Sequence, residues 1–327
     1  YYLRPMNCPH HHMIYAHDQW SYRDLPVRLS EYGQVYRHEA SGGLSGLMRV
    51  RGFCQNDAHI YCREDQAKDE FLNVMHMHAE YYRLFGIEDF WMRLSLPDFE
   101  NLDKYVDDTA GWKKALGILK AAMDESGYPY KEVEGEAAFY GPKVDFMVKS
   151  VVGTEYAIST NQLDFMATKR FDLGYTDADG EKKPVYVIHR APLGSHERFT
   201  AFLIEHYAGK FPTWIAPVQA IVIPIADRHE AYAEQVRKRL FEAEVDTVHG
   251  GVRVEADLAA ERMQKKIRNA QTRQIPYMLV VGDAEAEAGE VAVRHREHGD
   301  MGTMSVDALI ERIAKEQKTR ADLGKPA

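Results

Sequence analysis

Residues 53–61 spell Phe53-Cys54-Gln55-Asn56-Asp57-Ala58-His59-Ile60-Tyr61, and this stretch has the alternation of a β-strand. Because successive strand side chains point to opposite faces, one face carries Phe53, Gln55, Asp57, His59 and Tyr61. An aromatic ring, an amide, a carboxylate and an imidazole in one row are typical of a ligand-binding surface. The alternative is an edge strand whose polar face is solvated, and the spacing alone does not separate the two hypotheses.

The segments around this strand predict an antiparallel sheet. Strand-like residues at 33–39 and 49–63 flank a Gly/Ser-rich loop at 40–46, a pattern typical of a long hairpin. Helices are expected at 65–85 and 194–208, and further strands at 144–148, 155–159 and 185–190. We therefore predict an α+β domain, residues 1–212, in which helices flank an antiparallel sheet.

A second domain is expected at residues 213–327. Two prolines in the segment 211–217 interrupt a helical pattern, which predicts a boundary there. Beyond it, strands are expected at 219–225, 252–255, 277–282 and 290–296, and helices at 228–244 and 258–273. Ser305 can cap a closing helix. This alternation predicts an α/β domain with a largely parallel sheet.

Composition excludes several classes of protein. Hydrophobic residues make up 45% of the chain and aromatic residues 11%, which is enough for a large core and argues against disorder. No apolar run approaches the roughly 20 residues of a membrane span, and the first residues show no signal-peptide pattern. Three cysteines favour a reducing compartment, so we expect a cytoplasmic protein. The formal net charge of -9 disfavours indiscriminate polyanion binding, although a local basic patch can still bind nucleic acid.

Two motifs resemble signatures of the class II aminoacyl-tRNA synthetases. Tyr36-Arg37-His38-Glu39 resembles their second motif, and Gly194-Ser195-His196-Glu197-Arg198 resembles their third. Within this class, other segments are similar to the threonyl-tRNA synthetase family. The resemblance runs in unbroken order from residue 1 to about residue 317. These segments are Arg4-Pro5-Met6-Asn7-Cys8-Pro9, Arg49-Val50-Arg51-Gly52-Phe53, Asp57-Ala58-His59, Phe139-Tyr140-Gly141-Pro142-Lys143, Gln162-Leu163-Asp164-Phe165 and Ile188-His189-Arg190-Ala191.

The resemblance implies the fold, the reaction and the partners. It implies a class II antiparallel catalytic domain followed by an α/β anticodon-binding domain. The expected reaction is activation of L-threonine by ATP, with Mg²⁺, to threonyl-adenylate, followed by transfer to tRNA(Thr). The native protein is expected to be a homodimer without membrane contact. Two other hypotheses are an RNA-binding regulator that has lost catalysis and a paralogue that loads an amino acid onto a carrier other than tRNA.

The resemblance also implies that Cys8, His59 and His189 bind one Zn²⁺. Three protein ligands on tetrahedral zinc leave one open position, as in functional zinc sites. In the family this position receives the amino nitrogen and the hydroxyl of threonine, so valine is rejected by chemistry rather than by shape. The alternative is a closed structural site with a fourth protein ligand, for which His10, His11 and His12 are near in sequence.

The resemblance assigns the remaining site residues by position. Arg37 is expected to bridge the α-phosphate and the attacking carboxylate, and Arg198 to hold the β- and γ-phosphates, with Lys143 as a further catalytic cation. The expected ATP contacts are Arg37, Glu39, Arg49, Phe53, Gln162, Ser195 and Arg198, with Phe53 stacking on adenine and Glu39 binding the adenine amino group or magnesium. The expected threonine contacts are Gln55, Asp57, Tyr140 and Gln162, with Asp57 accepting from the substrate hydroxyl.

In the second domain, basic residues crowd the expected helix at 258–273. Charged helices are more often solvated faces than binding sites, but the resemblance implies that Arg268, Glu285 and Arg294 recognise anticodon bases. Ala259 and Ala260 depart from the family, which usually has an arginine and a polar residue there. The first class II motif and an amino-terminal editing domain have no counterpart among these 327 residues, which indicates a fragment.

Overall fold

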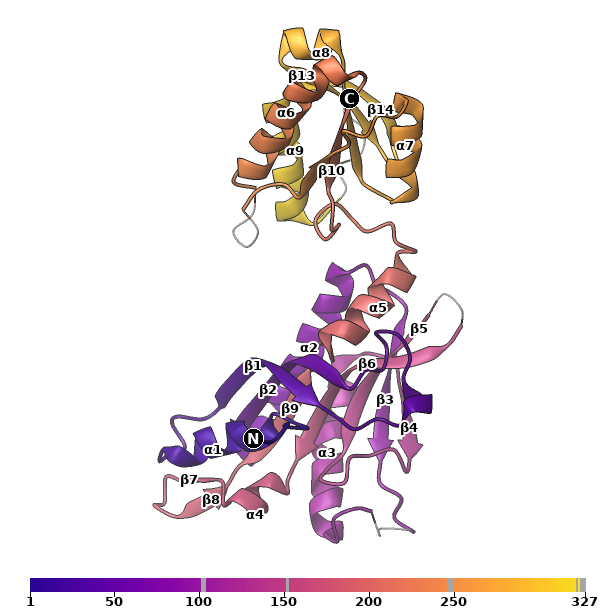
Figure 1. Ribbon diagram of the computed structural model, residues 1–327. Helices are drawn as coiled ribbons and strands as arrows, with labels where there is room; N and C mark the ends of the chain where they lie inside the picture. The colour runs from indigo at the N-terminus through magenta and orange to yellow at the C-terminus, as the bar shows by residue number, and fades with distance from the viewer. Residues whose placement is uncertain (101–103, 151–152, 246–249, 322, 324–327) are drawn as a thin grey trace. The chain divides into compact units, whose positions relative to one another are not determined.

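A seven-stranded sheet organises the first of two units, Tyr1–Phe202. The structure is a computed structural model that describes residues 1–100, 104–150, 153–245, 250–321 and 323 (Figure 1). The strand order is β1-β2-β9-β6-β5-β3-β4, and every neighbouring pair except β3 and β4 is antiparallel. The strands are β1 (Val27–Tyr36), β2 (Gly52–Cys62), β3 (Phe90–Leu96), β4 (Tyr130–Glu134), β5 (Lys143–Lys149), β6 (Glu155–Asp164) and β9 (Tyr186–Ala191). The predicted antiparallel sheet is therefore confirmed.

Helices and a small hairpin complete this unit. They are α1 (Cys8–His17), the 3₁₀ turn η1 (Ser41–Gly43), α2 (Glu64–Leu84), α3 (Thr109–Ser126), α4 (Ala167–Phe171), and the pair β7 (Gly174–Thr176) and β8 (Lys182–Pro184). A further helix, α5 (His196–His206), contains the division between the two units. Helix α2 packs on α3 and against strands β2, β6 and β9. The domain boundary near residue 212 stays a prediction.

Strand β2 lies inside the sheet, between β1 and β9. The edge-strand alternative is therefore wrong for residues 58–61, which pair with strands on both sides. The predicted hairpin is confirmed, because β1 and β2 pair along their whole lengths, from Val27 opposite Tyr61 to Tyr36 opposite Gly52. Its connection is longer than expected, since residues 37–51 all lie outside the two strands. Asp57 and His59 are buried on the polar row of β2.

The second unit, Leu203–Ala327, contains a five-stranded sheet of order β11-β10-β12-β13-β14. Its elements are β10 (Ala220–Pro224), η2 (Asp227–His229), α6 (Glu230–Glu242), β11 (Val254–Ala256), α7 (Met263–Thr272), β12 (Tyr277–Val281), α8 (Asp283–Ala288), β13 (Glu290–His295), β14 (Gly299–Ser305) and α9 (Val306–Thr319). The side chain of Ser305 caps α9 as predicted, by accepting from the Ala308 N–H.

The prediction of a largely parallel sheet in this unit is wrong. Strand β10 is parallel to β11 and β12, but β12, β13 and β14 pair antiparallel. The reason is the length of the connections. A parallel crossover needs about a dozen residues, whereas only the short helix α8 joins β12 to β13 and a tight turn joins β13 to β14.

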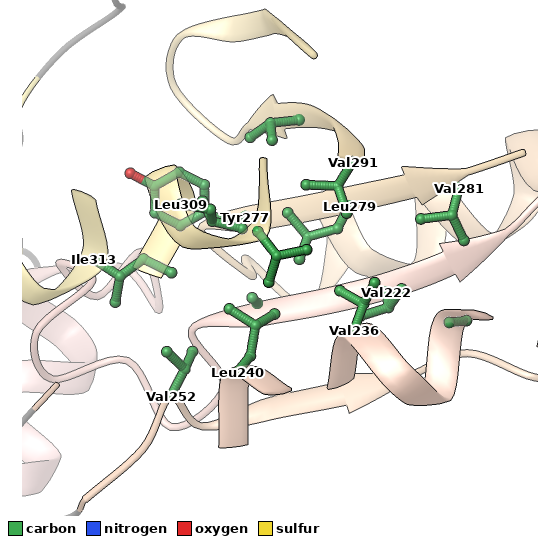
Figure 2. Packing of buried hydrophobic residues seen from close by; sticks show 14 of the residues in the cluster. Val222, Val236, Leu240, Val252, Tyr277, Leu279, Val281, Val291, Leu309 and Ile313 are labelled. Atoms are coloured by element: carbon green, nitrogen blue, oxygen red, sulfur yellow. The ribbon is translucent and has the colours of Figure 1, made fainter. Parts of the chain in front are cut away.

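Both faces of this sheet are covered, which explains why every residue of β10 and β12 is buried. Figure 2 shows one face, where Val222 and Leu279 of the strands pack against Leu240 of α6 and Leu309 of α9. On the other face, Ile267 of α7 belongs to a cluster with alternate strand residues. That cluster includes Ile221, Ile223, Met278 and Val280. None of the helices in the described ranges has the length and apolar composition needed to cross a membrane.

His78 of α2 makes the stability of the first unit pH-dependent. Its ring is fully buried 4.6 Å from the Phe146 ring, and neither ring nitrogen has a hydrogen-bond partner. Burial lowers its pKa from 6.5 to about 3, helped by the nearby charge of Arg190. The unfolded chain binds this proton more readily than the folded chain. The contribution of the neutral His78 ring to the free energy of unfolding is therefore fully present above pH 6.5 and is lost as pH falls toward 3.

We expect His78→Leu to reduce this acid sensitivity. At pH 5, proton uptake by His78 on unfolding lowers the free energy of unfolding by roughly 2 kcal/mol. An apolar side chain at this position removes that loss. Thermal midpoints measured at pH 7.5 and pH 5 should therefore differ less in the variant than in the unmodified protein. His17→Ala, which removes an exposed histidine, should leave the difference unchanged. An equal acid-induced drop in the His78 variant would contradict this account.

Candidate active site

A cavity of about 750 Å³ lies on the first unit, between the β1–β2 hairpin, strands β5 and β6, and the start of α5. Its walls include all of the residues predicted to bind ATP or to act in catalysis, together with Gln55, a predicted threonine contact. The ATP-binding and catalytic residues are Arg37, Glu39, Arg49, Phe53, Lys143, Gln162, Ser195 and Arg198. The side chains come from four separate segments of the chain, so the fold gathers the predicted residues around one space.

Arg198 is anchored at the wall of the cavity by two backbone carbonyls. Its Nε donates to the Met48 carbonyl at 3.0 Å, and one terminal nitrogen donates to the Ala157 carbonyl at 3.3 Å. Ser195 accepts from the Arg198 backbone N–H at 3.2 Å, which shapes the first turn of α5. Burial, and next the neighbouring Arg49, lower the pKa of Arg198, so an anion in the cavity would relieve an unfavourable positive charge.

Arg37 and Phe53 lie together on the hairpin. The Arg37 Nε donates to the Pro5 carbonyl at 3.0 Å, and its guanidinium carbon lies 5.2 Å from the centre of the Phe53 ring. This distance is within the range of a cation–π contact. The ring predicted to stack on adenine therefore has a guanidinium over it in this structure.

Acidic side chains hold the other cations of the cavity. Arg49 pairs with Glu39 at 2.9 Å, and Lys143 pairs with Asp145 at 2.9 Å. Arg93 also contacts Asp145 at 2.9 Å. The sequence interpretation did not identify Arg93 or Asp145 as cavity residues. A signal for Asp145 was available, because it lies two residues after Lys143 and therefore on the same face of β5.

Asp57 is buried beside Asn7, whose amide nitrogen donates to it at 3.1 Å. Burial raises the pKa of Asp57, and the hydrogen bond from Asn7 opposes that shift. Gly33 makes room for this arrangement, because a Cβ there would lie 2.2 Å from the Asn7 amide nitrogen. The Tyr140 hydroxyl, in the turn before β5, donates to the side chain of Gln162 on β6. Two of the predicted threonine contacts, Gln55 and Asp57, thus lie on β2, and the other two contact each other.

Cys8, His59 and His189 form a cluster in which one ligand atom of each lies within 4.8 Å of the others. Cys8 comes from the first turn of α1, and His59 and His189 are direct partners in the antiparallel pairing of β2 with β9. The Cys8 sulfur is 3.5 Å from His189 Nδ1. The Nε2 atom of His59 is buried and has no hydrogen-bond partner.

These residues fit the zinc ion that the family resemblance implies. One thiol and two imidazoles are ligands that zinc prefers, and an orphaned buried nitrogen has an unfavourable environment until it binds something. Burial lowers the pKa of His59 well below its usual value, which keeps the ring neutral as a ligand must be. Burial also disfavours charge on His189, but Cys8 and Asp164 outweigh it and raise its pKa to about 10.

The neighbouring histidines have other contacts. His11 Nδ1 lies 2.7 Å from His59 Nδ1, and His12 Nδ1 lies 2.9 Å from the Tyr61 hydroxyl. His10 is exposed. A second group of possible ligands, His12, Asp164 and His189, overlaps the first, but its Asp164 oxygen already contacts His189 Nε2 at 3.0 Å. Within the described residues, no fourth side chain completes the cluster of Cys8, His59 and His189.

The predicted anticodon residues lie on three elements of the second unit. Arg268 is exposed on α7 and Arg294 is exposed on β13, whereas the Glu285 carboxylate on α8 accepts from the Gly282 N–H at 2.9 Å. Not all of the basic helix faces solvent. Lys266 is buried and donates to the Asp257 carbonyl at 2.9 Å. Its role in the described structure is therefore to hold the loop before α7.

Comparison with protein families matches both parts of the chain. Residues 1–207 match the family described as tRNA synthetase class II core domain (G, H, P, S and T). Residues 219–316 match the family described as anticodon binding domain. Together the two matches cover nearly all of the two predicted domains.

Individual relatives point to one branch of that class. The chain is 52% identical over 315 residues to a threonine--tRNA ligase of Listeria welshimeri, covering 96% of this chain and 48% of the relative. It is 53% identical over 296 residues to one of Deinococcus radiodurans, covering 90% and 44%. The chain thus spans about half the length of the curated relatives it matches. A crystal structure described as the RNA binding domain of threonyl-tRNA synthetase from Cryptosporidium parvum Iowa II superposes with a TM-score of 0.87 at 36% identity, covering 99% of this chain and 77% of that one.

Proposed function

The chain belongs to the threonyl-tRNA synthetase family of class II aminoacyl-tRNA synthetases, and on this premise we propose that it activates L-threonine with ATP and transfers the threonyl group to tRNA(Thr). One observation carries the proposal. The polar row of β2 runs from Phe53 and Gln55, which line the arginine-rich cavity, through Asp57 to His59 in the metal-ligand cluster. The proposed nucleotide site and the proposed amino-acid site are therefore adjacent on one strand, as a reaction between the two substrates requires.

In the proposed first step, the threonine carboxylate attacks the α-phosphorus of ATP. An oxygen–phosphorus bond forms, the bond to the β-phosphate breaks, and pyrophosphate leaves with the displaced charge. Arg37 is proposed to orient the carboxylate and the α-phosphate, and the anchored Arg198 to neutralise the leaving pyrophosphate. Lys143 adds positive charge at the same cavity, and Mg²⁺ is expected to enter with ATP.

The residues that would hold zinc are Cys8, His59 and His189. When bound, zinc would supply a Lewis acid for the amino nitrogen and the hydroxyl of threonine. Asp57, kept in place by Asn7, is proposed to accept the hydroxyl proton of the substrate in a hydrogen bond. Gln55, Tyr140 and Gln162 are proposed to surround the amino acid, and the Tyr140–Gln162 hydrogen bond restrains two of them.

The remaining proposals concern partners and location. Arg268, Glu285 and Arg294 are proposed to contact anticodon bases, and the capping bond of Glu285 means that its carboxylate must be shared with or released from Gly282. We also propose a homodimer in the cytoplasm. Exposed apolar side chains such as Tyr32 of the edge strand β1 and Met13 of α1 support association through this part of the first unit.

Pyrophosphate exchange tests the proposed reaction. With ATP, labelled pyrophosphate and threonine, the purified chain should form labelled ATP, and adding tRNA(Thr) should yield threonyl-tRNA. A regulator without catalysis would show neither activity. A paralogue that loads another carrier would show exchange without charging tRNA. Substituting valine for threonine in the exchange should give almost no product if the hydroxyl is recognised.

Asp57→Ala should reduce threonine activation much more than ATP binding. A buried substrate hydroxyl left without its acceptor costs ~1–3 kcal/mol, or about 5- to 150-fold in rate. Exchange at varied threonine concentration and equilibrium binding of ATP separate the two effects. Asp57→Asn, which keeps an acceptor oxygen, should lose less. If the alanine variant still prefers threonine over valine as strongly, Asp57 does not recognise the hydroxyl.

A further inference from the structure

Each histidine of the metal-ligand cluster has its second ring nitrogen occupied by another side chain. His189 Nε2 lies 3.0 Å from Asp164 Oδ2, and His59 Nδ1 lies 2.7 Å from His11 Nδ1. The other nitrogen of His11 lies 3.3 Å from Glu31 Oε1. A carboxylate therefore acts on one ligand directly and on the other through an intervening imidazole.

These contacts determine which nitrogen of His189 keeps a proton when the ring is neutral, as it must be to bind a metal. An ionised carboxylate has no proton to donate, so the nitrogen that faces Asp164 must be the N–H. In the neutral ring that leaves a lone pair on Nδ1, the atom 3.5 Å from the Cys8 sulfur. Asp164 is itself held firmly, because its other oxygen accepts from the Met166 and Ala167 backbone N–H groups at 2.7 and 2.8 Å.

The same reasoning applies to His59 in two steps. Glu31 requires the N–H of His11 on Nε2, so the Nδ1 of a neutral His11 can only accept. His59 must then donate from Nδ1, which leaves its lone pair on Nε2. That is the nitrogen found buried without a partner. In their neutral forms, which metal binding requires, both histidines thus carry the proton away from the atoms that the cluster needs as ligands.

We propose that Glu31 and His11 on one side, and Asp164 on the other, are positioning residues that set the tautomers of His59 and His189 for metal binding. The inference rests on the proposed zinc site. Residues of this kind typically contribute 10- to 100-fold to metal affinity, because they fix the ring and raise its basicity. The proposal also gives a role to Glu31, which faces Asp57 across the β1–β2 pairing and binds Arg4 at 3.1 Å.

Zinc affinity of the whole 327-residue chain tests the proposal by competition with a chromophoric chelator. His11→Ala should weaken binding about 10- to 100-fold. His11→Asn should restore most of the loss, because its amide oxygen can accept from His59 Nδ1. His17→Ala, an exposed histidine of the same helix, is the control and should bind as the unmodified protein does. Unchanged affinity in His11→Ala would overturn the inference, whereas no zinc bound by the unmodified protein would overturn the proposed metal site.

A second variant should move the protons of His11 and His59 to their other ring nitrogens without removing either ring. In Glu31→Gln, Arg4 can only donate, so it should hold the amide oxygen and turn the amide NH₂ toward His11 Nε2. His11 would then donate from Nδ1, and the proton of His59 would move to Nε2. Imidazole ¹⁵N NMR on zinc-free protein, with thermal unfolding to verify the fold, should find His59 protonated on Nδ1 in the unmodified chain and on Nε2 in the variant. Protonation on Nε2 in the unmodified chain would refute the proposal.

Discussion

Replacing Arg198 with alanine should lower threonine-dependent pyrophosphate exchange about a thousandfold or more, while the fold stays intact. The reason is that the guanidinium meets charge that grows on the leaving pyrophosphate, and losing such a contact costs several kcal/mol of barrier. Exchange rates and thermal unfolding of the purified variant measure the two quantities. Arg37→Ala should have a similar effect, since Arg37 is proposed to act on the α-phosphate in the same cavity.

Two further variants separate charge from position. Arg198→Lys keeps the charge but cannot reproduce both bonds, to the Met48 and Ala157 carbonyls, so it should recover only part of the activity. Arg23→Ala removes an exposed guanidinium whose Nε donates to the hydroxyl of the neighbouring Tyr22, and exchange should be unaffected. Near-normal exchange in Arg198→Ala would place the ATP site elsewhere.

Cys8→Ala should remove the bound zinc and most of the threonine activation. We expect one zinc per chain in the unmodified protein and only a small fraction in the variant, because two imidazoles remain of a three-residue cluster. The loss of exchange activity should exceed the ~100-fold that residues supporting a metal ligand can contribute. Elemental analysis of dialysed protein gives the zinc content, and exchange at saturating ATP gives the activity.

The matched control for this experiment is Cys54→Ala. Cys54 is also a partly buried cysteine near the site, but it lies on the opposite face of β2 from His59. Its zinc content and threonine activation should equal those of the unmodified chain. Stoichiometric zinc in Cys8→Ala would show that another set of ligands holds the metal, and zinc lost equally from both variants would indicate general damage.

Local periodicity predicted the helices and strands with a clear hydrophobic pattern well. The helix expected at 65–85 is α2 (Glu64–Leu84), and the strand expected at 144–148 lies within β5. Helix α3 was missed although its signals were present. Asp108 accepts from the Gly111 N–H at its start, and Gly127 ends it with a φ of 70°. Helix α1 offered a weaker signal, because Pro9 is typical of a first helical turn but the run of histidines after it has no clear apolar face.

Part of the site could also be predicted from motifs. The family resemblance named Arg37 and Arg198, and the structure places both on one cavity. It gave no role to Glu31 or Asp164, and His11 was named only as a possible fourth zinc ligand, because nothing local in the sequence shows which side chain will face a given ring nitrogen. The basic residues at 258–273 show the opposite error. Their charge suggested an exposed patch, but Lys266 is buried and donates to the Asp257 carbonyl.

The sequence by itself determined the class of fold, the alternating polar row of β2 and the set of side chains available for chemistry. These follow from local rules, since a period of two residues defines a strand face and motif order identifies a family. The family resemblance implied that Cys8, His59 and His189 share a metal ion, but only the tertiary structure shows how they meet. Their positions are far apart in the chain, and the contact depends on the register of β2 against β9, which sets His59 opposite His189. Register is fixed by the packing of whole strands in the sheet, so no short stretch of sequence contains it.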